Sequence, residues 1–185
     1  TLSKKEAETL ERSLEQIKEK DLTIQSLQDA INKRDSVTFA LVTSLKGATV
    51  GIDDEDISIN VEKGVVYVSI SDKLLFTSGS SKLSKEALAV LGKVAQVLKS
   101  QPELEFMVEG HTDNKAVRQG ASFEDNWELS AERAASVVRV LEKDFSIKPE
   151  RMTVAGKGEY APVASNDSAE GRAQNRRTRI VILPK

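Results

Sequence analysis

Cysteine is absent from this chain of 185 residues. Without it the chain has no disulfide, no thiolate zinc site and no cysteine nucleophile, and it is compatible with an oxidising compartment. The sequence also lacks any apolar run near the ~20 residues that a membrane span needs. The first residue is Thr rather than Met, and no signal-peptide pattern follows it. We therefore expect a mature or trimmed chain, with any membrane anchor lying upstream of it.

An excess of basic residues is also missing. Lys and Arg number 27 against 29 Asp and Glu, which gives a formal charge of -2 and a pI near 5.6. Binding to nucleic-acid phosphates needs a clear basic excess or a basic stripe, so we expect no nucleic-acid partner. The length is typical of one folded domain with an appendage.

Glycine and proline are absent from residues 1–46, which are dense in Glu, Lys, Gln and Leu. Apolar residues recur every seven positions here, the period of a coiled coil: Leu10, Ile17, Ile24 and Ile31. The second seam holds only Leu14 and Leu27 and is half filled. Two interpretations stay open: a weak coiled coil that forms a homodimer, or one solvated amphipathic helix. Residues 37–45 are too apolar for a free helix, so we expect this end to dock.

Residues 47–64 form the next segment, which we interpret as a linker and the first strand of a hairpin. Its acidic cluster, residues 53–56, lacks the Gly and Glu that an EF-hand loop requires at its sixth and twelfth positions, and it indicates a solvated turn. We expect one folded domain over residues 65–185.

Strand and helix patterns alternate through that domain. A hairpin is predicted over 57–61 and 65–70, and further strands over 104–108, 152–156 and 177–183. One helix follows Ser84, with Leu88, Leu91, Ala95 and Leu98 on its buried face; another is expected to be capped by Ser130. A short helical stretch is expected near 168–175. The order predicts an α+β fold, a β/α/β/α/β sandwich with helices on one face of a mixed sheet, preceded by the long N-terminal helix.

Catalytic chemistry has few candidates. His111 is the only histidine, and a lone His beside Thr and Asp at a strand end is most often a structural hydrogen-bonding residue. His111 and Asp113 would supply two metal ligands, but catalytic zinc usually takes three. We therefore expect no enzyme and no cofactor. An envelope hydrolase or metal-dependent enzyme that uses His111 and Asp113 remains the alternative.

Two opposite charges, Asp113 and Arg133, are predicted on separate rigid elements. They form either a salt bridge with each other or the two halves of a clamp for a ligand that carries both charges. An amino-acid head group is such a ligand, and the planar fork of Arg suits its carboxylate because it donates two parallel hydrogen bonds.

Four motifs appear in order along the chain: DKLLFTSGSSKL (72–83), EGHTD (109–113), NWELSAERA (126–134) and GRAQNRR (171–177). Together they resemble the OmpA-like peptidoglycan-binding domain, over about residues 60 to 185. The resemblance implies a non-enzymatic anchor to peptidoglycan in the periplasm, attached to a membrane through a segment outside this sequence.

In that family the Asp of HTD binds the ammonium of diaminopimelate in the peptide stem, and the Arg of LSxxRA binds its carboxylate. The resemblance therefore assigns these roles to Asp113 and Arg133. Thr112 and Asn126 flank the clamp and would add hydrogen bonds. Arg176 would reach a glycan or a peptide carboxylate, or else solvate the surface.

The loop of residues 114–125 is longer than in many members of the family. Together with NWELS it resembles the branch of MotB-like motor stators, although OmpA-like lipoproteins with a helical stalk share these features. For Trp127, beside the clamp, we weigh a sugar-stacking role against a place in the core, and we predict the core because a single Trp before a helix is more often buried.

Overall fold

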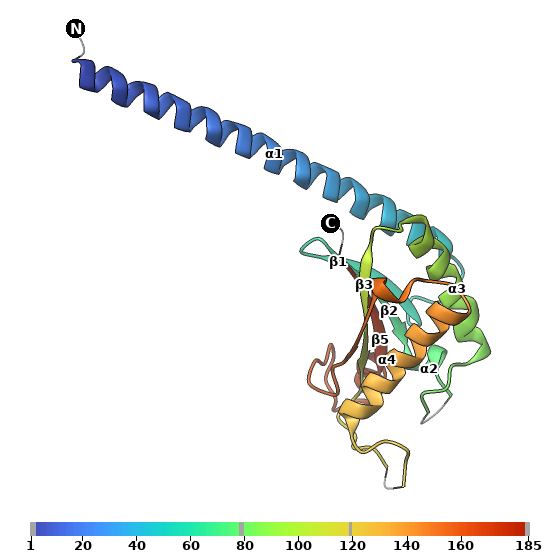
Figure 1. Ribbon diagram of the computed structural model, residues 1–185. Coiled ribbons are helices and arrows are strands. Elements are labelled where there is room, and N and C mark those ends of the chain that lie inside the picture. Colours follow the sequence, from blue (N-terminus) through green and yellow to red (C-terminus); the bar gives the residue numbers. More distant parts are fainter. Residues whose placement is uncertain (1–2, 78–79, 119, 184–185) are drawn as a thin grey trace. The chain divides into compact units, whose positions relative to one another are not determined.

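The computed structural model describes residues 3–77, 80–118 and 120–183 (Figure 1). Ser78 and Gly79 of the DKLLFTSGSSKL motif thus lie outside the described residues. The chain divides into two compact units, Thr1–Val37 and Thr38–Lys185, which are considered separately below. None of the helices in the described ranges combines the length and apolar content that crossing a bilayer requires.

The first unit is part of one helix, α1 (Lys4–Ala48), which continues into the second unit. A capping box starts it: the Ser3 hydroxyl accepts from the Glu6 amide at 3.4 Å, and a Glu6 oxygen accepts from the Ser3 amide at 2.7 Å. The apolar residues of its heptad stripe are all exposed: Leu10, Leu14, Ile17, Ile24, Leu27 and Ile31. The coiled coil stays a prediction.

The last turns of α1 belong to the second unit, and their burial confirms the docking expected for this end of the helix. Leu41 and Leu45 are almost completely buried, whereas Phe39, two residues before Leu41, is 75% exposed. The helix ends at Ala48, close to Gly47, where the predicted linker begins.

A five-stranded sheet forms the centre of the second unit, in the order β1-β2-β5-β3-β4. The strands are β1 (Ile57–Glu62), β2 (Val65–Ser71), β3 (Glu105–His111), β4 (Met152–Gly156) and β5 (Arg177–Leu183). The β3–β4 pair is parallel, and the other pairs are antiparallel. The mixed sheet predicted from the sequence is therefore confirmed.

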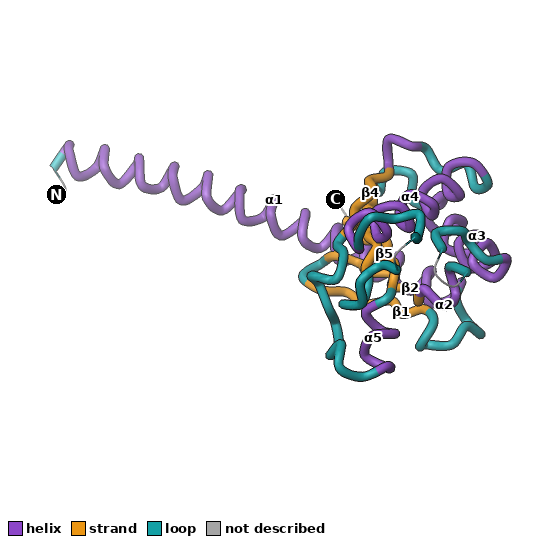
Figure 2. The backbone as a smooth tube through the Cα atoms, turned by 90° about the horizontal axis from the view of Figure 1, so that it is seen from below, coloured by secondary structure: helices purple, strands orange, loops and turns teal. Residues whose placement is uncertain are grey.

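The helices of this unit are α2 (Asp72–Leu75), α3 (Lys85–Ser100), α4 (Asn126–Lys143) and α5 (Ala169–Asn175), with a 3-10 turn η1 (Pro149–Arg151). In Figures 1 and 2, α3 and α4 lie on one face of the sheet. This face carries the apolar residues of alternate strand positions, including Val68, Val108 and Ile180, all fully buried and aligned across β2, β3 and β5. The α+β fold with helices on one face is confirmed.

Two local predictions were wrong. Ser130 does not cap α4: the helix begins four residues earlier, where the Asp125 carboxylate accepts from the Glu128 amide at 2.9 Å. Leu88 is 38% exposed. The buried face of α3 is instead turned towards Val90 and Val94, which pack beside Leu91 and Leu98 in the core. The Ser84 cap is confirmed, since its hydroxyl accepts from Ala87 at 2.9 Å.

Close packing of α4 on the sheet positions the ends of the strands. A Cβ added to Gly110 of β3 would lie only 2.0 Å from the backbone oxygen of Ser130, so the helix and strand approach as closely as a glycine allows. This contact places the first turns of α4 directly over the end of β3, where the predicted site residues begin.

Candidate functional site

The segment that follows β3 carries Thr112 and Asp113, both buried. Backbone hydrogen bonds to the segment after β4 continue past the end of the parallel pair: Lys157 donates to Gly110 at 2.9 Å, and Thr112 donates to Gly158 at 2.9 Å. The Thr112 hydroxyl donates to the Asp113 backbone oxygen at 2.9 Å. These bonds hold the Asp113 backbone in one position.

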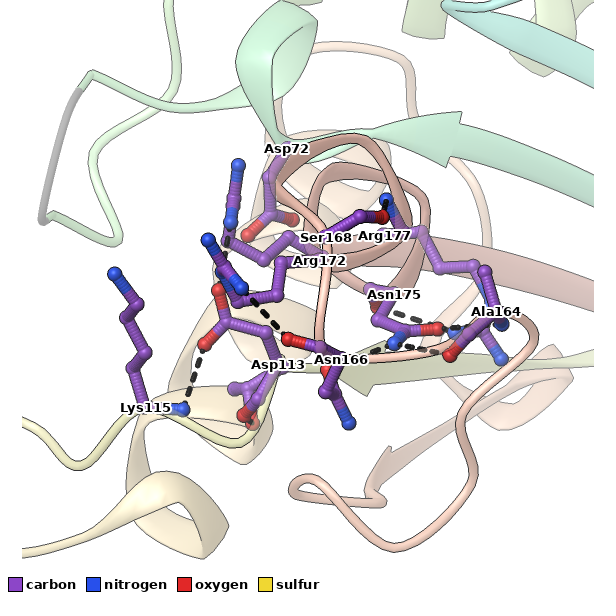
Figure 3. Close-up of polar contacts among 12 residues, drawn as sticks. Asp72, Asp113, Lys115, Ala164, Asn166, Ser168, Arg172, Asn175 and Arg177 are labelled. Carbon is purple, nitrogen blue, oxygen red and sulfur yellow. Dashed lines mark hydrogen bonds and ion pairs between the residues drawn. The ribbon is translucent and has the colours of Figure 1, made fainter.

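Asp113 has two partners of its own (Figure 3). One carboxylate oxygen accepts from the Lys115 backbone amide at 3.0 Å, and the other pairs with the Arg176 guanidinium at 2.6 Å. Arg176 follows the last residue of α5, and 41% of its side chain is exposed. The carboxylate is therefore paired with a cation that is itself open to solvent.

Arg133 lies two turns into α4 and is buried. Its guanidinium pairs with the Asp72 carboxylate, its Nε donates to the Ser80 backbone oxygen at 3.2 Å, and it lies over the Phe76 ring at 5.1 Å from the centroid. Asp72 and Phe76 both come from the segment after β2. The arginine is thus held by the segment that follows β2 and not by residues of its own helix.

Asp72 begins α2 and is only 6% exposed. Its Oδ2 pairs with Arg133, while its Oδ1 is buried without a hydrogen-bond partner among the described residues. Burial raises the pKa of Asp72 to about 6, although Arg133 and Arg176 act in the opposite direction. This carboxylate is therefore under-paired for a buried anion.

Asn126, the first residue of α4, connects three segments. Its side-chain amide donates to the Lys115 backbone oxygen at 3.0 Å and to the Glu159 carboxylate at 2.7 Å, and it lies 3.4 Å from the Asp113 backbone oxygen. These contacts hold the loop after β3 against the loop after β4.

One open groove of about 1430 Å³ collects all of the predicted ligand-binding residues. The residues that line it include Thr112, Asp113, Asn126, Arg133 and Arg176, together with Asp72. Asp113 and Arg133 each pair with a different residue, and the result is two ion pairs: Asp72–Arg133 and Asp113–Arg176. We refer to them as the groove pairs. The arrangement presents two anions and two cations to a ligand that enters the groove.

His111 takes no part in this groove. It is 1% exposed, and its Nε2 lies 3.3 Å from the Glu109 carboxylate, so a protonated Nε2 donates to that acceptor. Burial lowers the pKa of His111, which keeps the ring neutral. Neither His111 nor Glu109 is among the described residues that line the groove with Asp113. The two residues of the alternative catalytic interpretation therefore face different surroundings.

Comparison with known proteins identifies the family of the chain. The model of the OmpA family matches residues 75–176, which is more than half of the chain. The chain belongs to the OmpA family. The family resemblance predicted from the four motifs is thus confirmed.

Three similar proteins illustrate the family. Motility protein B of Bacillus subtilis is 35% identical over 120 residues, 65% of this chain and 46% of that protein. The outer-membrane lipoprotein YfiB of Pseudomonas aeruginosa is 30% identical over 155 residues, 78% of this chain and 89% of that protein. The solved structure of the cell wall anchor of the T6SS from P. aeruginosa matches with a TM-score of 0.67 and 28% identity, over 78% of this chain and 97% of that chain.

This OmpA-family chain spans about half the length of several relatives that it matches: 46%, 49% and 52% of the proteins concerned. The family match ends at Arg176 and includes every site residue predicted from the sequence. Asp72 precedes the first matched residue, yet it pairs with Arg133.

Sequence reasoning missed Asp72 and Glu159. Asp72 lies inside a quoted motif, directly after an apolar strand pattern, and this strand-end position is the signal that would have marked it. Glu159 has no such signal, because its bond to Asn126 joins residues 33 positions apart.

The prediction for Trp127 was wrong. The ring is 49% exposed and stacks on Tyr160 with 5.0 Å between ring centroids. Because α4 begins at Asn126 rather than after Ser130, Trp127 lies in the first helical turn at the end of the domain, away from the core.

Proposed function

We propose that this protein binds peptidoglycan non-covalently and anchors a cell-envelope structure to the wall. The groove pairs carry the proposal: Asp113 and Arg133 line one groove, come from different elements and are not committed to each other. The zwitterionic head of diaminopimelate in the peptide stem fits this arrangement, with its ammonium at Asp113 and its carboxylate at Arg133.

The names of the relatives agree with an envelope location. One relative is an outer-membrane lipoprotein, and a similar solved structure is described as a cell wall anchor. The protein accordingly acts in the periplasm, where the wall polymer is accessible, and is attached to a membrane.

Binding by one domain should be weak. Each charge-assisted hydrogen bond contributes about 1.5–3 kcal/mol, and association entropy opposes binding by several kcal/mol, so we expect a Kd of ~10 μM to mM. The existing groove pairs lower the net gain further, because a ligand must share Arg133 with Asp72 and Asp113 with Arg176. A polymer that offers many copies of the ligand compensates for weak single contacts.

Dimerisation through the first unit would strengthen the anchor. Its exposed heptad stripe, for example Ile17 and Ile24, has the spacing of a coiled-coil seam. A parallel pair of such helices would attach two binding domains to one mesh and raise avidity by about 10²–10⁴.

The experiment is a calorimetric titration with two stem peptides, one that contains diaminopimelate and one with lysine in its place. Lysine retains the ammonium and lacks the second carboxylate. Arg133→Ala should weaken binding of the diaminopimelate peptide by at least about tenfold and leave the lysine peptide little changed. Asp113→Ala should weaken both. Arg139→Ala, an exposed arginine of the same helix, is the matched control and should change neither.

Folding of each variant is checked by thermal unfolding. Equal losses for both peptides in Arg133→Ala would contradict the assignment of the carboxylate to Arg133. Binding to neither peptide, and to no isolated wall sacculi, would overturn the proposal.

The second candidate is the periplasmic part of a motor stator, in which the same grip resists torque. The similarity to Motility protein B favours it. Restoring motility to a strain that lacks its stator protein, with a chimera that carries this domain, would support it. A chimera that binds the wall but leaves the cells non-motile would favour the anchor alone.

The enzymatic alternative remains open to a direct assay. We infer that the domain is not an enzyme, because His111 is buried against Glu109 and the groove contains no neutral base of its kind among its described residues. Release of soluble fragments from purified wall, abolished by His111→Gln, would contradict this inference.

A further inference from the structure

An exposed aromatic pair stands at the end of the domain beside the groove. The Trp127 and Tyr160 rings lie 5.0 Å apart at an interplanar angle of 26°, and they are 49% and 66% exposed. Large aromatic side chains usually bury most of their surface, in the core or in an interface. Two stacked rings left open to solvent therefore require an explanation other than core packing.

A rigid backbone supports both rings. Gly158 has a positive φ of 55°, and the place where its Cβ would be lies 3.3 Å from a Tyr160 ring atom and 3.5 Å from a Trp127 ring atom. The Gly158 amide donates to the Ser130 hydroxyl at 3.0 Å, and its carbonyl accepts from the Thr112 amide at 2.9 Å. Trp127 thus lies on α4 itself and Tyr160 on a segment that is bonded to α4 and to the end of β3, and the two rings are preorganised for a flat ligand.

The aromatic pair is joined to the groove through its sequence neighbours. Asn126 lines the groove and precedes Trp127; Glu159 precedes Tyr160; and the two polar side chains are hydrogen-bonded at 2.7 Å. A ligand that extended from Asp113 past Asn126 would run towards the helical turn that carries Trp127. One Glu159 oxygen accepts from Asn126, and the other oxygen of this carboxylate is a hydrogen-bond acceptor that a sugar hydroxyl can use beside the rings.

We propose that Trp127 and Tyr160 form a carbohydrate-binding platform, which stacks against the apolar face of a pyranose ring in the glycan strand whose stem occupies the groove. This site rests on the proposed peptidoglycan function and deepens it. A pyranose presents axial C–H groups on one face and hydroxyl groups around its edge. The flat rings contact the C–H groups, and the neighbouring polar side chains form hydrogen bonds with the hydroxyl groups.

The platform gives the domain a second kind of contact with one polymer. The groove pairs bind the charged groups of the stem, and the platform binds the neutral sugar. A strand held at both points would bind more tightly than either fragment, because the second contact is formed within the same complex.

The fluorescence of Trp127 provides a direct test, since it is the only tryptophan of the chain. The probe is the disaccharide of N-acetylglucosamine, which is neutral and offers nothing to the groove pairs. We expect a saturable change in emission on titration. Tyr160→Leu keeps the reporter and an apolar side chain but removes the flat ring, and should weaken binding about threefold to tenfold.

Two control variants separate this site from the others. Phe39→Leu removes another exposed aromatic ring and should bind the disaccharide as the unmodified protein does. Arg133→Ala should also bind the disaccharide normally while losing the diaminopimelate peptide. Thermal unfolding checks that Tyr160→Leu is folded.

Each outcome decides between the two proposals. Disaccharide binding that Tyr160→Leu weakens and Arg133→Ala preserves supports the platform, even if stem-peptide binding fails and the clamp is lost. No saturable change with the disaccharide, in protein that binds the stem peptide, overturns the platform alone. An emission change that is equal in Tyr160→Leu overturns it as well, because the ring pair is then not the site.

Discussion

Two groups of charged side chains lie on the same domain and differ in how completely they are paired. One is the sheet cluster, which we define as Glu109, His111, Lys157 and Arg179. Its central carboxylate accepts two hydrogen bonds from Arg179 at 2.9 and 3.2 Å, lies 3.3 Å from His111 and pairs with Lys157 at 3.7 Å. The other consists of the groove pairs, in which Asp72 has one cationic partner and an oxygen without a partner among the described residues.

The pKa values of the two carboxylates reflect this difference. Burial by itself would raise the pKa of Glu109, but the hydrogen bonds from His111 and Arg179 outweigh it and lower the pKa to about 2. For Asp72 burial dominates, and the pKa rises to about 6. At Asp72 one hydrogen-bonded arginine, with Arg176 as a second nearby cation, does not compensate for the lost hydration of the buried carboxylate, whereas the several donors around Glu109 do.

The comparison teaches how to distinguish a structural ion cluster from a ligand site in this fold. In the sheet cluster both oxygens of the Glu109 carboxylate are paired with protein groups, so this carboxylate offers little to a ligand, although the buried His111 Nδ1 has no partner among the described residues. The groove pairs keep unused capacity at Asp72 and at the exposed Arg176. Substitutions in the first group should therefore lower stability at neutral pH, whereas substitutions in the second should change binding and, at Asp72, the pH dependence of stability.

The largest expected effect is the loss of stability in Glu109→Gln. The substitution keeps the shape of the side chain but leaves Arg179 and Lys157 without their anion, and we expect the free energy of unfolding to fall by about 3 kcal/mol. Urea denaturation measures it. Glu132→Gln, which breaks the exposed pair with Arg139, is the control and should cost less than about 1 kcal/mol. Equal losses of stability in the two variants would show that the sheet cluster contributes no more to stability than an exposed ion pair does.

The pH dependence of stability should separate the two carboxylates. The pKa of Asp72 is raised from 3.8 to about 6 in the folded protein, so its contribution to stability is fully present below pH 3.8 and is lost as the pH rises through 6. The pKa of Glu109 is lowered from 4.5 to about 2, so its contribution is present above pH 4.5 and is lost as the pH falls through 2.

Asp72→Asn tests the pH dependence of stability that is expected from Asp72. Between pH 4 and 7 the unmodified protein should lose stability relative to this variant, by an amount on the order of 3 kcal/mol. Denaturant unfolding at several pH values measures the difference between the two proteins. A difference that does not change with pH would mean that Asp72 is as well compensated as Glu109.

A smaller effect is expected on ligand binding by Asp72→Asn at pH 7.5. Removing the negative charge leaves Arg133 with its bond to Ser80 and its contact with Phe76, and frees its guanidinium for the stem carboxylate. We expect affinity for the diaminopimelate peptide to rise by about threefold to tenfold. Affinity for the lysine peptide should stay the same. Weaker binding of the diaminopimelate peptide would show that Asp72 serves mainly to orient Arg133.

The smallest effect is expected for the stability of Arg176→Gln. Its pair with Asp113 is short, but 41% of the arginine side chain is exposed, and exposed ion pairs contribute about 0–1 kcal/mol. Urea denaturation should give a free energy of unfolding for Arg176→Gln close to that of Arg139→Gln. A loss of stability near that of Glu109→Gln would mean that the Asp113–Arg176 pair has a structural role like that of the sheet cluster.

Much of this protein was determined by local sequence. The alternation of apolar residues in β2 and β5, the Ser84 cap and the absence of Gly and Pro from the first 46 residues are short-range signals, and each led to the correct element. The motifs around Asp113 and Arg133 were sufficient to bring both into one predicted site. Such signals survive in the sequence because they depend on neighbours within a few residues.

Only the tertiary structure decided which charges meet. Asp72 and Arg133 are 61 positions apart, and Asp113 and Arg176 are 63 apart. Trp127 and Tyr160 likewise stack across the ends of two elements, which overturned the predicted place of Trp127 in the core. Pairing across such separations depends on strand order and on the closeness of α4 to Gly110. Burial then sets the pKa of Asp72, because the hydration that an anion loses depends on the whole fold around it and not on its neighbours in the chain.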